Sequence, residues 1–297
     1  MIGLGRMGAN MAQRLLRGGH RIIGFDPAES ARKLIEEKGA QSVTSLEALV
    51  AKLKAPRIFW LMLPAGEITD STITGLTPLL SAGDTLIDGG NSNYRDTQRR
   101  AQALAQRAVH YVDSGTSGGV WGLAEGYSLM IGGDEAVIER LRPIFETLAP
   151  APDKGWGRVG AVGAGHYTKM IHNGIEYGLM QAYAEGFSIL QHKSEFMLDL
   201  PQIAEIWRYG SVVRSWLLDL TAAALAKNPT LHGIAPYVAD SGEGRWTVAE
   251  AIELDVPAVV ITASLLERLR SRDIDCFSDK LVSAMRNQFG GHAIKEE

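Results

Sequence analysis

Five polar side chains in the middle of the chain have a spacing that a helix would turn into one face. Lys169, His172, Asn173, Glu176 and Tyr177 stand at positions i, i+3, i+4, i+7 and i+8, and residues three and four apart are neighbours on a helix surface. Lysine, histidine, glutamate and tyrosine are groups that enzymes use for proton transfer. A solvated helix surface is the alternative, but this mixture just after a predicted domain junction favours a functional face. Another face, which can pack in a core, carries Ile171, Ile175, Leu179 and Ala182.

A glycine-rich turn at the start of the chain has the GxGxxG spacing of a dinucleotide-binding fingerprint. Its residues are Gly3, Leu4, Gly5, Arg6, Met7 and Gly8. They follow a short predicted strand and open a predicted helix, a setting in which glycines let backbone N–H groups approach a pyrophosphate. A glycine turn without a ligand is the alternative. The position between strand and helix favours a cofactor site formed by all six residues.

An acidic residue, Asp26, ends the next predicted strand, where such fingerprints place the group that binds the adenosine ribose. Its carboxylate can accept hydrogen bonds from the ribose hydroxyls and would repel a 2'-phosphate. We therefore predict NAD as the cofactor, with NADP as the less favoured one. In the alternative interpretation Asp26 caps the turn with Pro27, and the nearby cations Arg32 and Lys33 would soften the discrimination.

His172 and Glu176 also form an i, i+4 pair that can hold a metal ion. Two ligands without a clear third are a weak signal. A nicotinamide and a lysine can carry out hydride and proton transfer without a metal ion, so we predict no metal site.

The order of the predicted elements indicates two domains. Residues 1–162 alternate apolar runs with helix-like segments, as in a mainly parallel sheet covered by helices. The predicted strands are Met1–Leu4, Arg21–Phe25, Ala40–Val43, Arg57–Leu63, Thr85–Asp88, His110–Asp113 and Ser128–Gly132, and the predicted helices are Met11–Arg17, Ala31–Lys38, Leu46–Lys52 and Arg95–Gln106. Over residues 163–297 apolar residues recur at helical spacing. The sequence predicts an α/β Rossmann-type N-terminal domain followed by an all-α C-terminal domain.

The composition is that of an ordinary globular protein, with 45% hydrophobic and 22% charged residues. A formal charge of -4 lacks the basic excess of nucleic-acid-binding proteins, so we expect no nucleic acid as a partner. The longest apolar run, Val256–Leu266, is too short to span a bilayer, and no secretory signal is visible. With Cys276 as its single cysteine, the chain is expected to be cytoplasmic, with no membrane contact.

Segments spread over nearly the whole chain resemble the 6-phosphogluconate dehydrogenases, within the wider family of β-hydroxyacid dehydrogenases. They are Gly3–Gly8, Leu63–Gly66, Ile87–Ser92, Ser117–Gly119, Lys169–Tyr177, Gly244–Thr247 and Arg286–His292. The run from His172 to Tyr177 is the most specific, because generic β-hydroxyacid dehydrogenases typically lack its Glu-Tyr continuation. The family's longer members carry a second helical repeat, so this chain resembles the short form.

The resemblance implies oxidative decarboxylation of 6-phosphogluconate to ribulose 5-phosphate and CO2, in gluconate utilisation and the pentose phosphate pathway. Lys169, in its neutral form, would take the proton from the C3 hydroxyl while hydride leaves C3 for the nicotinamide. Glu176 would then protonate C1 of the enediol. These two are the implied catalytic residues.

The resemblance also implies how the substrate and the cofactor are held. Substrate contacts are implied for Asn91, Ser117, Gly118, Gly119, His172, Asn173, Tyr177, Arg268, Arg286 and His292, and cofactor contacts for Leu63, Pro64, Ala65 and Asn91. Tyr177 and Arg268 would approach the phosphate. Arg286 and His292 match a tail that reaches the neighbouring subunit's site, which implies a homodimer or homotetramer. Periodicity alone favours an exposed, frayed C-terminus instead.

One departure from the family concerns the phosphate. Family members commonly place a lysine and a threonine before the Arg-Trp-Thr match, where this chain has Ser241 and Glu243. A glutamate repels a phosphate, which weakens the expected preference for a phosphorylated substrate. Two alternatives stay open: a β-hydroxyacid dehydrogenase that acts on a smaller or unphosphorylated acid, and a non-catalytic dinucleotide-binding sensor. Glu176 argues against the first, and Lys169 with Glu176 against the second.

Overall fold

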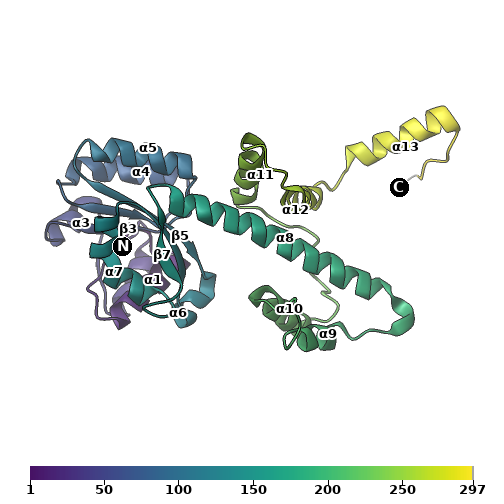
Figure 1. Cartoon of the computed structure of the whole chain (residues 1–297), viewed down its shortest axis with the longest axis horizontal. Helices are drawn as coiled ribbons and strands as arrows, with labels where there is room; N and C mark the ends of the chain where they lie inside the picture. Colours follow the sequence, from purple (N-terminus) through teal and green to yellow (C-terminus); the bar gives the residue numbers. More distant parts are fainter. Residues whose placement is uncertain (296–297) are drawn as a thin grey trace. The chain divides into compact units, whose positions relative to one another are not determined.

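The computed structural model describes residues 1–295, which divide into two compact units, one from Met1 to Asn173 and one that begins at Gly174. The first unit combines a sheet with helices, and the described part of the second contains helices joined by turns and loops (Figure 1). The predicted Rossmann-type α/β domain followed by an all-α domain is confirmed. The units divide within a long helix, α8 (Ala164–His192), whereas the predicted boundary at 162/163 precedes that helix.

The sheet of the first unit is mainly parallel, as predicted. Its strands are β1 (Ile23–Phe25), β2 (Gln41–Val43), β3 (Ile58–Leu61), β4 (Thr85–Asp88), β5 (His110–Ser117), β6 (Ser128–Gly132) and β7 (Trp156–Gly160). β1 pairs with β2, and β3 to β7 pair in chain order, with only the β5–β6 pair antiparallel. Ile2 forms parallel bridges to both Phe25 and Leu61 and so links the two sets of strands.

Helices bury both faces of this sheet. They are α1 (Arg6–Arg17), α2 (Glu29–Glu36), α3 (Leu46–Lys52), α4 (Glu67–Leu76), α5 (Tyr94–Ala105), α6 (Gly122–Glu125) and α7 (Glu135–Leu148). Successive side chains of a strand point to opposite faces. On β3, Trp60 therefore joins the core formed with α1 and α7, while Phe59 and Leu61 join the core formed with α3, α4 and α5. Burial on both faces explains why β3 is apolar throughout rather than alternating.

The sequence missed some elements of this unit. The predicted strand Met1–Leu4 is reduced to the bridge at Ile2, and β7, α4 and α7 were not predicted. β7 is an edge strand whose residues are all partly or fully exposed, so it has no apolar pattern to detect. α7 contains Pro143, a residue that ordinarily ends a helix.

In its described residues, the second unit contains the C-terminal part of α8 and five further α-helices. These are α9 (Leu200–Trp207), α10 (Trp216–Lys227), α11 (Glu243–Glu253), α12 (Val259–Arg270) and α13 (Phe277–Gly290). Phe187 of α8 packs in a small core with Ala204 of α9 and Leu218 of α10. Within residues 1–295, no helix is both long enough and apolar enough to cross a bilayer.

Candidate active site

The glycine turn before α1 has the close packing that a dinucleotide site requires. Gly3 has a φ of 86°, in the left-handed region that favours glycine. A Cβ added at Gly8 would lie 2.0 Å from the Gly3 carbonyl oxygen, so a larger residue would push the turn apart. Gly5, which precedes the first turn of α1, is exposed, and an added Cβ there would meet no atom within 4 Å. The open N-terminus of α1 fits a pyrophosphate. Of the other turn residues, Leu4 is buried, Met7 is half-buried and Arg6 is exposed.

Asp26 follows β1 and holds this glycine turn. Its Oδ2 accepts a hydrogen bond from the Leu4 N–H at 2.8 Å, and its Oδ1 accepts one from the Ala28 N–H at 2.8 Å. The turn-capping alternative is therefore present in the structure. Each carboxylate oxygen has a second lone pair, which can still accept a ribose hydroxyl. Arg32 donates to the carbonyl oxygens of Asp26 and Pro27 at 2.6 and 2.9 Å, so a cation lies beside the same turn.

A second loop, at the end of β3, lies next to the glycine turn. A Cβ added at Gly3 would be 2.9 Å from Cδ2 of Leu63. Pro64 and Ala65 are exposed, and the Pro64 carbonyl accepts a hydrogen bond from Thr69 at 2.8 Å. The structure thus brings Leu63 and the turn together, as a shared cofactor contact requires.

Asn91 joins the loop after β4 to the end of β5. Its φ of 54° is left-handed, a conformation that asparagine tolerates better than most residues. Its Nδ2 donates to the Thr116 carbonyl at 3.0 Å, and its Oδ1 accepts from the Thr116 N–H at 2.8 Å. Ser117, the last residue of β5, directly follows Thr116, to which Asn91 is hydrogen-bonded. Gly118 and Gly119 come next in the chain.

A buried polar network that the sequence analysis did not predict supports the Asn91 loop. The Asp88 carboxylate accepts hydrogen bonds from Ser92 Oγ at 2.8 Å and from Tyr111 Oη at 3.0 Å, and Arg100 lies 3.3 Å from it. Arg100 also donates to Asp70 at 2.8 Å. Burial, together with the charge of Asp88, raises the pKa of Tyr111 well above its ordinary value, so the phenol stays a donor. The network fixes the loop that carries Asn91.

The N-terminus of α8 is fixed by two further buried residues that the sequence analysis missed. Asp113 of β5 accepts the N–H groups of Gly163 and His166 at 2.7 and 2.8 Å, which satisfies donors that a helix start leaves open. Its negative charge also interacts favourably with the positive N-terminal end of the helix dipole. The His166 ring lies 3.0 Å from the Asp88 carbonyl and 2.7 Å from Thr97 Oγ1. A carbonyl can only accept, so Nε2 of His166 carries a proton.

Lys169 stands one turn further along α8 and is buried. A Cβ added at Gly115 of β5 would lie 2.5 Å from the Lys169 Cβ, so the absence of a side chain there lets α8 approach the strand. The Lys169 Nζ donates to Asn173 Oδ1 at 2.5 Å and lies 3.2 Å from Nδ1 of His172. The predicted grouping of Lys169, His172 and Asn173 on one helix face is therefore present. Glu176, which is half-buried, follows Lys169 by two turns on the same helix.

In the second unit, Tyr177 and Arg268, the two residues expected to approach the phosphate, lie together. The guanidinium carbon of Arg268 lies 3.4 Å from the centroid of the Tyr177 ring. The Ser241 N–H reaches the Tyr177 hydroxyl at 3.5 Å, and the Ser241 hydroxyl donates to the buried Glu243 carboxylate. A Cβ added at Gly244 would lie 2.5 Å from the Tyr177 ring, so the first turn of α11 packs closely on α8. The departure at Ser241 and Glu243 is thus located beside the pair predicted to bind phosphate.

The remaining predicted residues lie elsewhere. Arg286 is exposed on α13, and the exposed His292 follows that helix, with its carbonyl accepting from Asn287 at 2.9 Å. Within residues 1–295, Arg286 forms no hydrogen bond with Tyr177 or Arg268, and its role in a neighbouring subunit stays a prediction. Likewise, no three His, Cys, Asp or Glu side chains of that described range gather as metal ligands would.

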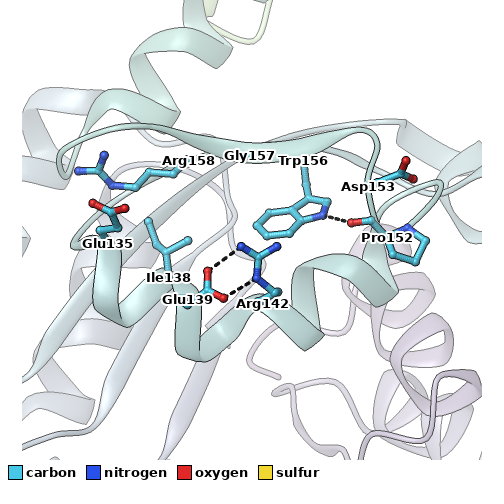
Figure 2. Close-up of a pocket in the computed structure, with 9 residues that line it drawn as sticks. All are labelled: Glu135, Ile138, Glu139, Arg142, Pro152, Asp153, Trp156, Gly157 and Arg158. Carbon is cyan, nitrogen blue, oxygen red and sulfur yellow. Dashed lines mark hydrogen bonds and ion pairs between the residues drawn. The ribbon is translucent and has the colours of Figure 1, made fainter.

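A pocket of about 330 Å³ between α7 and β7 is separate from these residues. Figure 2 shows Arg142 over the Trp156 ring, with Glu139 binding the guanidinium through two hydrogen bonds of 2.6 Å. The Trp156 Nε1–H donates to the Pro152 carbonyl at 2.8 Å. None of the predicted site residues lines this pocket.

Comparisons with known proteins show the family of this chain. The family described as the NAD binding domain of 6-phosphogluconate dehydrogenase matches residues 1–163, and that described as the 6-phosphogluconate dehydrogenase C-terminal domain matches residues 165–276. A Haloferax volcanii protein named as an NAD(+)-dependent, decarboxylating 6-phosphogluconate dehydrogenase is 42% identical, over 99% of this chain and 97% of its own length.

Longer relatives are matched in part. A Bacillus subtilis enzyme of the same name is 38% identical over 91% of this chain, which spans 60% of that enzyme's length. A solved Plasmodium falciparum 6-phosphogluconate dehydrogenase, studied with NADP+ and with 6-phosphogluconate, is similar with a TM-score of 0.84 and 29% identity. The similarity covers 100% of this chain and 65% of that one.

Proposed function

The chain belongs to the 6-phosphogluconate dehydrogenase family, and on that premise we propose that it oxidises and decarboxylates 6-phosphogluconate to ribulose 5-phosphate and CO2 while reducing NAD. The observation that carries this proposal is the environment of the buried Lys169. Its Nζ is hydrogen-bonded to Asn173 and lies near His172. Its Cβ packs against β5 at Gly115, two residues before Ser117. A lysine so placed can exchange a proton with a substrate held between the Asn91 loop and α8.

Lys169 acts twice in the proposed reaction. As the neutral amine it takes the C3 hydroxyl proton, while NAD, when bound at the glycine turn, accepts the hydride from C3. The C1–C2 bond then breaks, CO2 leaves, and its electron pair delocalises into the C3 carbonyl as an enediol. The protonated Lys169 stabilises the developing oxyanion, returns its proton to it, and takes that proton back when protonation of the enediol carbon forms the C2 carbonyl of the product. Asn173 and His172, which contact Nζ, orient the amine during both transfers.

Glu176 completes the reaction. As a carboxylic acid it protonates the enediol carbon that becomes C1 of ribulose 5-phosphate. Its position on α8, two turns from Lys169, lets one helix supply both the base and the acid. The proposal assigns substrate contacts to Asn91 and Ser117, and contacts with the phosphate to Tyr177 and Arg268.

Initial rates with two acids test this function. We expect kcat/KM for 6-phosphogluconate to exceed that for gluconate by about 100-fold or more, because charge-assisted hydrogen bonds to the phosphate are lost with gluconate. Purified full-length protein is assayed for reduced-nicotinamide absorbance with each acid and with NAD or NADP. Reduction of NAD or NADP with gluconate but not with 6-phosphogluconate would instead indicate a dehydrogenase of unphosphorylated hydroxy acids.

Asp26 is proposed to set the preference for NAD over NADP. For Asp26→Ala we expect the ratio of kcat/KM with NAD to that with NADP to fall at least about tenfold, because the repulsion of the 2'-phosphate is lost and Arg32 lies beside the turn. Both values also fall, since the Leu4 N–H loses its acceptor. Glu29→Ala removes the same charge from an exposed pair with Lys33 and is the control. An unchanged ratio in Asp26→Ala would refute the proposal.

A homodimer or homotetramer is part of the proposed function. Ile175 and Leu179, which follow each other by one turn on α8, are 52% and 47% exposed rather than packed in a core as the periodicity suggested. An apolar cleft of about 540 Å³ lies among α8, α9 and α10. A second copy would remove these apolar surfaces from water. Light scattering of the purified protein tests this, and a monomer mass at micromolar concentration would rule it out.

A further inference from the structure

The loop 238–243, which precedes α11, is tied to the C-terminal end of α12 by successive contacts. The Ser271 hydroxyl accepts the Val238 N–H at 3.0 Å, and Arg268 donates to the Ala239 carbonyl at 3.0 Å. Asp240, which follows Ala239 in the loop, accepts a hydrogen bond from Arg272 at 2.7 Å. The end of α12 therefore places two guanidinium groups along one loop.

Asp240 gathers a third guanidinium at the same place. Its carboxylate accepts from Arg245 Nε at 3.0 Å and Nη2 at 3.2 Å, in addition to Arg272. The hydrogen bond from Arg245, with a second from Arg272, lowers the pKa of Asp240, so the carboxylate stays charged. One carboxylate cannot neutralise two guanidinium groups, and a positive excess is left on this pair.

Arg268 adds to that excess. Its hydrogen bonds go to the Ala239 carbonyl and the Met180 sulfur, and its plane rests on the Tyr177 ring, all of which are uncharged groups. Glu243 brings one negative charge to the loop, but its buried carboxylate is engaged by the Ser241 hydroxyl. Three guanidinium groups thus share this loop with two carboxylates.

Other cations of the second unit are balanced differently. Arg208 binds two carboxylates, Glu205 at 2.8 Å and Asp219 at 2.8 Å. Arg270, only two residues from Arg272, pairs with Asp279 at 3.4 Å. The positive excess at loop 238–243 is therefore a local feature, and it coincides with the Tyr177–Arg268 stack.

We propose that Arg272 and Arg245, held side by side by Asp240, bind the phosphate of the substrate together with Arg268. This inference rests on the proposed function and names residues for its phosphate end. It accounts for the departure at Ser241 and Glu243, because the positive charge for the phosphate comes from other positions. Arg272 follows the end of α12, and Arg245 lies in the first turn of α11. Arg272 is 24% exposed and Arg245 is 50% exposed in their side chains, so both are accessible to a ligand. Guanidinium groups suit a phosphate because they donate two parallel hydrogen bonds.

Arg272→Met tests this assignment in the full-length protein. We expect KM for 6-phosphogluconate to rise about 10- to 100-fold while kcat changes less than about threefold, since the lost bonds hold the phosphate and not the reacting carbons. The inhibition constant of inorganic phosphate, used as a competitive inhibitor, should rise by a similar factor. Arg272→Lys, which keeps the charge, should recover part of the affinity.

Arg270→Met is the matched control, because it removes the same charge two residues away from a pair outside the loop. It should leave both KM and phosphate inhibition within about twofold of the wild type. Equal KM values in Arg272→Met and wild type would overturn the inference. A wild-type protein that turns over gluconate but not 6-phosphogluconate would overturn the proposed function itself, so the two failures are distinguishable.

Discussion

Lys169→Met is expected to lower kcat with 6-phosphogluconate by roughly 10²- to 10⁴-fold, the usual contribution of a positioned proton-transfer group. Methionine fills a similar volume and keeps the buried stem in contact with β5, but it cannot take a proton. NAD should still bind, because the glycine turn and Asp26 lie at the start of α1, whereas Lys169 lies on α8 and packs against β5. Steady-state rates, with NAD affinity from fluorescence quenching, provide the measurement.

Lys193→Met serves as its control. Lys193 lies just after α8 and pairs with Glu195 at 2.5 Å, in an exposed position, so its loss should leave kcat within about twofold of wild type. Near-normal turnover of Lys169→Met would require another residue as the base. A loss of NAD binding equal to the loss of rate would instead assign Lys169 a purely structural role.

Glu176→Gln is expected to reduce complete turnover to ribulose 5-phosphate by about 10²-fold or more, with NAD affinity retained. Glutamine keeps the shape and the hydrogen-bonding capacity of the side chain but has no proton to give to carbon. The variant should be measured by product formation as well as by absorbance, because hydride transfer precedes the step that Glu176 serves.

Glu185→Gln makes the same change on the same helix. Glu185 is exposed and accepts a hydrogen bond from Gln181 at 2.8 Å, so this substitution should have little effect. Unchanged product formation in Glu176→Gln would remove the acid role of Glu176 and require another proton donor for the enediol carbon.

Local patterns in the sequence predicted the parts of the site that depend on local geometry. Helical spacing alone places Lys169, His172 and Asn173 on one face, and the structure joins their side chains through Nζ and Oδ1. The GxGxxG spacing predicted the turn before α1 because steric limits on the backbone act over only a few residues. Of the two interpretations of Asp26, the turn-capping one is present in the structure, and the ribose contact stays a prediction.

The supports of the site depend on residues far apart in the chain, and periodicity carries no information about them. Asp113 accepts N–H groups some 50 residues later, and His166 meets the Asp88 carbonyl across 78 residues. Arg272 and Asp240 are also distant in sequence, 32 positions apart. Such pairs form only when tertiary packing brings two elements together, so a single sequence does not reveal them.

The central claim is that this chain couples oxidation to loss of CO2, and the ratio of released CO2 to reduced nicotinamide tests it most directly. Purified protein would be given 6-phosphogluconate labelled at C1 and NAD, with trapped label and absorbance followed together. The account predicts one CO2 for each NADH throughout the reaction. NADH formed without labelled CO2 would contradict it and leave a dehydrogenase that does not decarboxylate.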